Sequence, residues 1–245
     1  MRILIGYSMR SGSTLLQHIL HQHPTIKSFS DLNSLLVLPP LVCGVPLDNI
    51  CVKPMDLFFL GRSIFFRKRF DRFVWITRDP RDSYVSSLEY KWASAFCRKG
   101  RKVNGVSTGL VKRWQKVYRH YFNSPDRWHL VRYEDLTMRP EETTGQLLDY
   151  LGLPQHNVLE FDQFKGLGGG DMKLRKENTV HRKSVYRFRK TLSIEQQQVF
   201  ADMIAPEMEQ LGYDPQPRGA SESFAQRITS CASSFDELAG GEALQ

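Results

Sequence analysis

The chain has 245 residues, 41% of them hydrophobic, so it is long and apolar enough for one domain with a substantial core. Its 34 Lys and Arg residues outnumber its 26 Asp and Glu residues, and the net charge of +8 suits an anionic small molecule or nucleic acid. The basic residues are not interleaved with the signature of an RNA-recognition motif, a zinc finger or a helix-turn-helix, so we expect no nucleic-acid partner.

Cysteine usage and hydropathy exclude further classes of protein. The four cysteines form neither a C-x-x-C pair nor a metal-ligand spacing with histidine, so we expect neither a disulfide framework nor a metal site. There is no run of 18 apolar residues, and strand-like residues begin directly after Met1. We therefore expect a cytoplasmic protein without a membrane span.

Hydrophobic patterning predicts strands that alternate with helices along the chain. The expected strands are 2–7, 26–30, 50–53, 73–77 and 128–132, and the expected helices are 13–22, 32–38, 56–70, 82–97, 110–123, 140–151 and 193–211. Ser193 and Gln196 have the spacing of a capping box at the start of the last helix.

This alternation predicts an α/β fold in three α/β/α layers around a mostly parallel sheet, with ligands at the carboxyl ends of the strands. Residues 100–109 and 166–170 are expected to be loops. Residues 1–214 are expected to form one domain, and residues 215–245, rich in Ser, Ala and Gly, a flexible tail.

The first strand, turn and helix carry the most informative motif, Arg10-Ser11-Gly12-Ser13-Thr14. A tight loop that opens a helix directs backbone N–H groups and positive potential toward one point, which favours an anion. A nucleotide P-loop reads G-x-x-x-x-G-K-[ST], but here five residues separate the glycines and Ser13 replaces the lysine. Arg10 is then the expected cation. The alternative is an ordinary helix capped by Ser11 or Ser13.

A second strand–helix junction carries Arg78 and, eight residues later, Ser86. An arginine at the strand end and a hydroxyl two turns into the helix can converge on a second anion. The alternative is a surface turn in which Arg78 pairs with Asp79 and Arg81 pairs with Asp82.

These motifs together resemble those of sulfotransferases that use 3′-phosphoadenosine-5′-phosphosulfate (PAPS). Residues 10–15 resemble the R-S-G-[ST]-T loop of that family, and residues 78–86 resemble its R-D-x-R-x₄-S pattern. Residues 129–136 are similar to its apolar strand ending in Y-E-D-L. The resemblance covers roughly residues 1–215 and is nearest in style to the tyrosylprotein and carbohydrate branches.

The resemblance implies a P-loop-like sulfotransferase fold, PAPS as the donor and adenosine 3′,5′-bisphosphate (PAP) as the product. It implies that the 5′-phosphosulfate binds Arg10, Ser11, Gly12, Ser13, Thr14 and Leu15. It implies that Arg78 and Ser86 bind the 3′-phosphate with help from Arg187, and that Tyr133 lies near the adenine. Phe188 stands where the family usually has tryptophan, so Arg182 and Lys183 are alternatives to Arg187.

The catalytic base is expected to be Asp31, which follows His23-Pro24 at the distance where the family branch has a glutamate. Its alternative role is the N-cap of the helix at 32–38. Lys53 resembles the family lysine that reaches the sulfate, and with Arg10 it is expected to stabilise charge; its alternative is a surface lysine. The nearby His18, His21 and His23 are expected to be surface or capping residues.

Two other functions stay open: a P-loop kinase of a small molecule, and a non-catalytic nucleotide-binding module of the same fold. The acceptor is expected to be a small molecule, a glycan or a peptide tyrosine, received by a pocket with walls at 32–66 and 90–110. A homodimer is compatible with the sequence.

Overall fold

A computed structural model describes residues 1–89, 101–159, 180 and 183–219. Its centre is a five-stranded sheet in the order β2-β3-β1-β4-β7, in which every pair is parallel. The strands are β1 Arg2–Tyr7, β2 Lys27–Ser30, β3 Ile50–Lys53, β4 Arg72–Thr77 and β7 His129–Arg132. The apolar runs of β1 and β4 are buried because helices cover both faces of the sheet.

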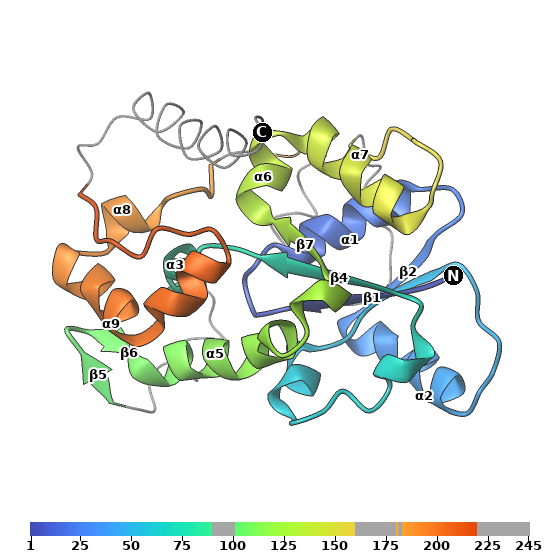
Figure 1. The fold of residues 1–245 in the computed structure, drawn as a ribbon, viewed down its shortest axis with the longest axis horizontal. Helices are drawn as coiled ribbons and strands as arrows, with labels where there is room; N and C mark the ends of the chain where they lie inside the picture. Colours follow the sequence, from blue (N-terminus) through green and yellow to red (C-terminus); the bar gives the residue numbers. More distant parts are fainter. Residues whose placement is uncertain (90–100, 160–179, 181–182, 220–245) are drawn as a thin grey trace, which may run out of the picture.

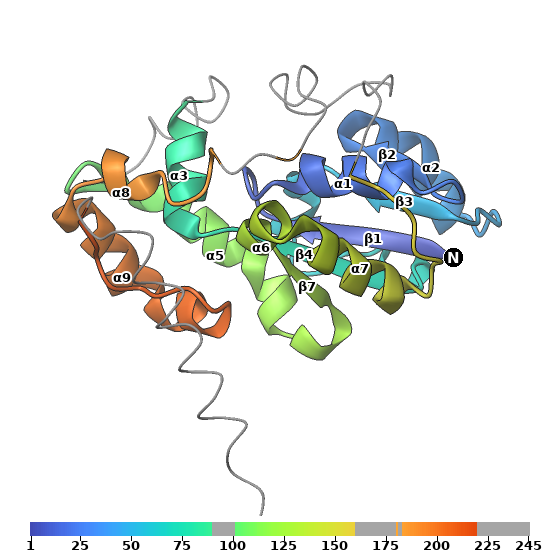
Figure 2. The same cartoon turned by 90° about the horizontal axis from the view of Figure 1, so that it is seen from above.

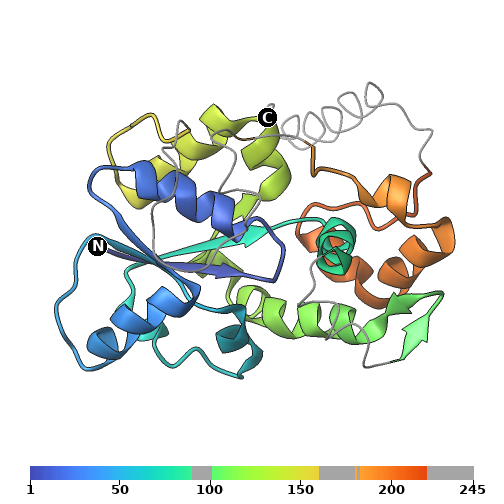
Figure 3. The ribbon, with the colours of Figure 1, turned by 180° about the vertical axis from the view of Figure 1, so that it is seen from behind.

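The helices form two outer layers (Figures 1 and 3). One face carries α1 Ser13–Gln22, α6 Tyr133–Met138 and α7 Pro140–Leu151, and the other carries α2 Ser34–Val42 and α5 Thr108–Phe122. The remaining helices, α3 Pro80–Leu88, α8 Phe188–Thr191 and α9 Ile194–Gln210, lie beyond the carboxyl ends of the strands. This arrangement confirms the three-layer α/β/α prediction.

The core is built around Trp75 on β4. Its ring contacts the rings of Phe59, Tyr118 and Trp128 at centroid distances of 5.7, 5.3 and 5.0 Å. A Cβ on Gly6 would lie 2.3 Å from the Trp75 ring, so only glycine lets this part of β1 lie beside the indole. The packing holds β1 and β4 together just before the two strands end.

The prediction of a helix over 56–70 is wrong. The structure has two short 3₁₀ turns there, η2 Asp56–Leu60 and η3 Arg67–Arg69, separated by an irregular stretch that begins at Gly61. Aromatic rings at 58, 65 and 66 contact one another through this stretch, with centroid distances of 5.1 to 6.5 Å. The tertiary packing of these rings therefore overrides the local preference for a helix that the hydrophobic spacing indicates.

Two other predictions differ from the structure by more than one or two residues. The helix expected at 32–38 runs from Ser34 to Val42 and includes Pro39 and Pro40. Residues 100–109 are not only a loop: β5 Lys102–Val103 and β6 Val106–Ser107 pair as a hairpin, and α5 already begins at Thr108. The turn residues Asn104 and Gly105 have φ of 46° and 82°, values that favour Asn-Gly in tight hairpins.

The capping box at Ser193 and Gln196 is confirmed, and α9 bends at Ile204, two residues before Pro206. Residues 214–218 still contact the domain, since Arg218 N donates to Gln197 Oε1 at 2.9 Å. The predicted helix beyond residue 89, the loop at 166–170 and the tail from 220 onward lie outside the described residues. Among the helices of the described ranges, none is long and apolar enough to span a bilayer.

Candidate functional site

The candidate site lies where β1 and β4 end (Figure 2). From β1 the chain crosses through α1 toward β2 and β3, whereas β4 leads toward β7 on the other side of the sheet. The carboxyl ends of β1 and β4 therefore flank a topological switch point, where open parallel sheets bind their ligands. The loop at 8–12 and the helix α3 both start at this edge.

The loop subsite, residues 10–15, has an unusual backbone. Arg10 has φ of 66° and Gly12 has φ of 89°, so the chain turns sharply before α1 begins at Ser13. Within the described residues no side chain caps α1, which does not support the interpretation of Ser11 or Ser13 as a simple helix cap. The Ser11 hydroxyl is buried and finds no hydrogen-bond partner in that part of the chain. Uncapped N–H groups and a buried free hydroxyl suit an anionic ligand.

Tyr133 closes one side of the loop. Its ring packs so tightly on Gly12 that a Cβ there would lie 2.2 Å from Tyr133 Cδ2. The guanidinium of Arg78 lies over the same ring, 4.7 Å from the centroid. Tyr133 is buried and forms the first residue of α6. The structure thus places it against the loop subsite, and its contact with an adenine stays a prediction.

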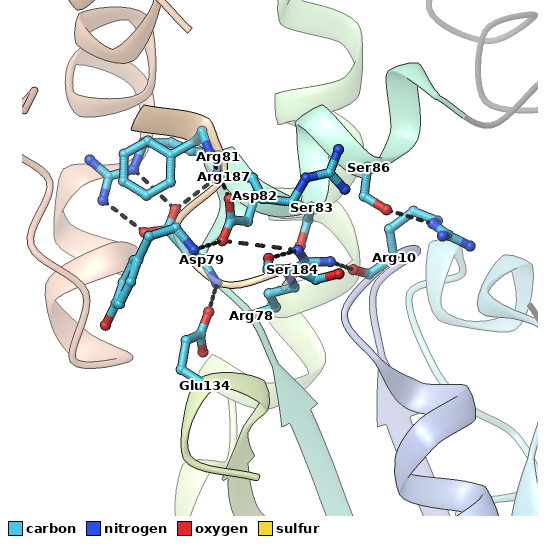
Figure 4. Close-up of polar contacts among 12 residues, drawn as sticks. Arg10, Arg78, Asp79, Arg81, Asp82, Ser83, Ser86, Glu134, Ser184 and Arg187 are labelled. Carbon is cyan, nitrogen blue, oxygen red and sulfur yellow. Dashed lines mark hydrogen bonds and ion pairs between the residues drawn. The ribbon is translucent and has the colours of Figure 1, made fainter. Parts of the chain in front are cut away.

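The arginine–serine subsite, Arg78 with Ser86, meets the loop subsite directly (Figure 4). Arg10 Nε donates to Ser86 Oγ at 3.0 Å, and Arg78 Nη1 donates to the carbonyl of Arg10 at 3.3 Å. Arg78 Nε is buried and has no hydrogen-bond partner among the described residues. The two subsites expected from the sequence are therefore brought together, with Arg10 reaching toward Ser86.

The charged turn at 78–82 is not a solvated surface turn. Arg78, Asp79, Arg81 and Asp82 are at most 4% exposed. Arg81 pairs with Asp79 at 2.8 Å, and Arg78 lies 3.9 Å from Asp82, so the ion pairs exist but are buried and differ from the expected pairing.

Asp82 ties a distant part of the chain to this turn. Its carboxylate accepts the backbone N–H groups of Tyr186 and Phe188 at 2.6 and 2.8 Å. Arg78 Nη2 also donates to the carbonyl of Ser184. Burial raises the pKa of Asp82 to about 7, against the lowering effect of the Arg78 charge. We call residues 183–188 the clasp segment, because these bonds hold it over the start of α3.

Arg187 belongs to the clasp segment but does not meet Arg78. It pairs with Glu89, which follows the end of α3, with Nη1 donating to Oε2 at 3.2 Å. Glu89 lies three residues after Ser86, so the pair is at the rim of the arginine–serine subsite. The role of Arg187 toward a phosphate stays a prediction. Of its two alternatives, Arg182 lies outside the described residues, and Lys183 stays a sequence-based alternative.

A second polar cluster joins Asp31, Lys53 and Tyr7 at the ends of β2, β3 and β1. Lys53 Nζ donates to both carboxylate oxygens of Asp31 at 2.8 and 2.9 Å. The Tyr7 hydroxyl donates to the carbonyl of Pro54 at 2.8 Å and lies 3.4 Å from Asp31 Oδ1. Lys53 is buried, so it is not a surface lysine, and burial lowers its pKa although Asp31 opposes the shift.

Asp31 itself is not a helix cap. In the described ranges no side chain caps η1 Asp31–Asn33 or α2, and the Asp31 carboxylate points to Lys53 instead. Its φ of 49° shows that the backbone turns sharply at this residue. With 26% of its side chain exposed, the carboxylate is accessible to a ligand while the ammonium beneath it is buried.

The three histidines do not join this cluster. His23 is 2% exposed and contacts the carbonyl of Pro154 at 3.2 Å, and His18 is buried within α1. His21 is exposed near the end of α1. His21 is thus a surface residue and His23 the C-cap residue of α1, both as expected, whereas His18 is buried and is neither. Among the described residues, no group of three or more His, Cys, Asp or Glu side chains is placed to hold a metal ion.

A small pocket of about 30 Å³ opens beside the loop subsite. Its walls come from the loop, α3, α5 and α9, and they include Met9, Ser83, Trp114 and Phe200. Ser83 Oγ and Trp114 Nε1 are buried without hydrogen-bond partners in the described part of the chain. Of the ranges expected to wall an acceptor pocket, only Leu110 contributes here.

Sequence reasoning missed three residues that shape the site. From the sequence, Asp82 is predicted to begin a helix and Tyr7 to end a strand. Glu134 is only the second residue of the Y-E-D-L motif, with no role of its own. Glu134 is buried and accepts the backbone N–H of Asp79 and the hydroxyl of Tyr213, each at 3.0 Å. For Glu134 the available signal was a carboxylate two residues after an apolar strand, because a carboxylate buried there needs hydrogen-bond donors.

A parallel sheet with a sharply turned loop and a helix N-terminus after β1, and an arginine–serine pair after β4, is the arrangement typical of P-loop-like enzymes that handle a phosphate- or sulfate-bearing ligand. Residues 71–157 match the model of the sulfotransferase family. The chain is 24% identical over 267 residues to Protein-tyrosine sulfotransferase 1 of Danio rerio, covering 87% of this chain and 72% of that protein.

Solved structures of sulfotransferases share the fold of this chain. A sulfotransferase domain from the curacin biosynthetic pathway is similar with a TM-score of 0.63 at 20% identity, covering 86% of this chain and 97% of that one. A sulfotransferase domain from the Synechococcus PCC 7002 olefin synthase gives 0.61 at 17% identity, covering 87% and 94%. Mouse sulfotransferase SULT7A1 complexed with PAP gives 0.51 at 14%, covering 85% and 84%. Residues 71–157 thus match the sulfotransferase family, the chain has the fold of solved sulfotransferases, and the two findings support a sulfotransferase function.

Proposed function

We propose that this sulfotransferase moves the sulfuryl group of PAPS to a hydroxyl group of its acceptor by in-line displacement. The observation that carries the proposal is the meeting of Arg10, Arg78 and Ser86 beside an uncapped helix N-terminus. PAPS has two anionic groups, and the site offers two adjoining sets of donors. The family match and the PAP-complexed relative support the same donor.

The loop subsite fits the 5′-phosphosulfate. Backbone N–H groups from Gly12 to Leu15 and the hydroxyls of Ser11, Ser13 and Thr14 are its donors. The Ser11 N–H already donates to the carbonyl of Ser8, whereas the buried Ser11 hydroxyl has no partner among the described residues. The arginine–serine subsite fits the 3′-phosphate, for which Arg78 Nε, without a hydrogen-bond partner in the described ranges, is a ready donor. We assign Arg187 to the rim of this subsite and Tyr133 to the side of the adenine.

Asp31 is the proposed base. In the transfer, the bond between sulfur and the bridging oxygen of the 5′-phosphate breaks, and a bond from sulfur to the acceptor oxygen forms. The acceptor proton passes to the Asp31 carboxylate. Lys53 holds this carboxylate in place, and with Arg10 it stabilises the charge that develops on the bridging oxygen.

For the acceptor we propose a peptide tyrosine, because the matched relative is named a protein-tyrosine sulfotransferase. A small molecule or a glycan with a hydroxyl group is the alternative. The pocket of about 30 Å³ beside Met9 adjoins the loop subsite and has mostly apolar walls; it is too small for a tyrosine ring as it stands, so a tyrosine acceptor requires these walls to open. The cytoplasmic location and the homodimer stay predictions.

Calorimetric titration with PAP, together with transfer of labelled sulfate from PAPS to tyrosine peptides, tests the proposal. Asp31→Asn should bind PAP like the native chain and lose at least about 100-fold in transfer rate. Asp48→Asn, an exposed carboxylate on another loop, is the control and should keep both activities. Binding of PAP without transfer to any acceptor would favour a non-catalytic module. Phosphoryl transfer from ATP would favour a kinase, and failure to bind PAP would refute the assignment of the donor.

A further inference from the structure

Helix α2 has an apolar side that the described residues leave uncovered. Val37, Leu38 and Leu41 are buried against the sheet, while Leu36 is 63% exposed on the opposite side. Leu32, Leu35, Pro39 and Val42 are also exposed and recur at helical spacing with Leu36. The one polar residue of α2, Ser34, is buried. A surface helix normally carries polar residues on its outer side, so this one is built for contact.

A basic segment lies beside the end of this helix. Arg69 in η3 donates to the carbonyl of Val42 at 2.8 Å, which joins η3 to the last residue of α2. Arg62, Lys68 and Arg69 are exposed, and so is Phe65, at 67%. No acidic residue occurs from 57 to 70 in the sequence. Figures 1 and 3 show α2 and the neighbouring turn at the outer edge of the molecule, away from α3, α8 and α9.

We propose that this surface, the outer side of α2 with residues 62–69, docks on an anionic lipid bilayer. Exposed leucines and a phenylalanine flanked by arginine and lysine are the combination that binds at a membrane interface. A second copy of the chain is the less suitable occupant, because a two-fold contact would place like basic residues near each other. The proposal is independent of the donor and the acceptor.

Sedimentation of the full chain with lipid vesicles tests the docking. The chain should sediment with vesicles of phosphatidylcholine and phosphatidylglycerol, much less with phosphatidylcholine alone, and less as salt rises. Leu36→Asp should abolish sedimentation. The matched control is Ile194→Asp, an exposed apolar residue at the start of α9, which should sediment like the native chain.

The basic contribution has its own pair of variants. Arg62→Gln with Lys68→Gln should weaken binding about 30-fold, since each charge near the surface contributes about one fivefold step. Lys112→Gln with Lys116→Gln, exposed on α5, should have little effect. All these side chains are exposed, so circular dichroism should show native folding. Absence of binding to anionic vesicles, or equal losses in the test and control pairs, would refute the proposal. A lipid-free oligomer that Leu36→Asp dissociates would assign the surface to a second copy instead.

Discussion

Replacing Gly12 with alanine tests the architecture of the loop subsite. Two independent penalties are expected. The φ of 89° costs a residue with a Cβ about 1–2 kcal/mol. The new Cβ would lie 2.2 Å from Tyr133 Cδ2 and 2.8 Å from Cε2, and such overpacking costs about 1–3 kcal/mol more. We therefore expect Gly12→Ala to lower the free energy of unfolding by about 2–5 kcal/mol.

Two further variants separate these penalties. Gly44 has φ of 86°, but no atom of the described residues lies within 4 Å of where its Cβ would stand. Gly44→Ala should therefore lose only the backbone part, about 1–2 kcal/mol. In a Tyr133→Ala background the overlap is removed, so the additional cost of Gly12→Ala should fall to the same level.

Urea denaturation of the four variants and the native chain measures these differences. PAP titration of Gly12→Ala adds a functional measurement, and we expect weaker binding because the ring must move and the loop with it. Equal losses for Gly12→Ala and Gly44→Ala, or additive effects of Gly12→Ala and Tyr133→Ala, would show that Tyr133 does not hold the loop.

Further variants probe charge in the site and at the sheet edge. Because burial raises the pKa of Asp82 to about 7, ionising it costs stability; the free energy of unfolding should fall as pH rises from about 4 to 7, and Asp82→Asn should remove that slope. Asp71 should show the opposite pH dependence, because Arg2 lowers its pKa: its contribution to the free energy of unfolding is present at neutral pH and is lost as the pH falls into the acid range. Asp71→Asn should therefore lower stability at neutral pH and remove this loss at low pH. Lys53→Met leaves the Asp31 carboxylate without its ion-pair partner, so it should lower the melting temperature and, at temperatures where the variant stays folded, reduce sulfuryl transfer about 100-fold; unchanged transfer by the folded variant would contradict this. Arg78→Lys should weaken PAP binding about tenfold or more and leave adenosine 5′-phosphosulfate, which lacks the 3′-phosphate, unchanged; equal weakening of both would place Arg78 elsewhere.

Much of the fold can be predicted because its signals are local. The apolar runs ending at Tyr7, Lys53 and Thr77 are predicted as strands with the carboxyl ends that the structure shows. The Asn104-Gly105 turn is also a local signal, but the two strands it joins have only two residues each, so the pattern favours a loop. The stretch 56–70 has helical spacing, and only the packing of its aromatic rings decides against a helix.

The site is predictable in its parts and not in its connections. Arg10, Arg78 and Ser86 each follow from a strand–helix junction, yet the bond between Arg10 and Ser86 spans 76 residues of sequence. The bond from Tyr186 to Asp82 spans 104. No local pattern encodes which buried carboxylate will receive a distant backbone N–H. Asp31 illustrates the same limit, because a helix cap and a partner for Lys53 look alike until the strands are paired.

The clasp segment also sets an order of events during synthesis. Asp82 cannot accept its hydrogen bonds until the N–H groups of Tyr186 and Phe188 have been synthesised. Arg81 cannot donate to the carbonyl of Gln216 until that residue, 135 positions later, has been added. At ribosomal speeds this interval lasts on the order of ten seconds. Throughout it, the charged side chains of Arg81 and Asp82 in the nascent chain lack these hydrogen-bond partners. A ribosome stalled before residue 216 would carry a chain that has all five strands of the sheet but lacks the last of these contacts. The turn at 78–82, although synthesised early, therefore reaches its final set of hydrogen bonds only when the C-terminal residues emerge.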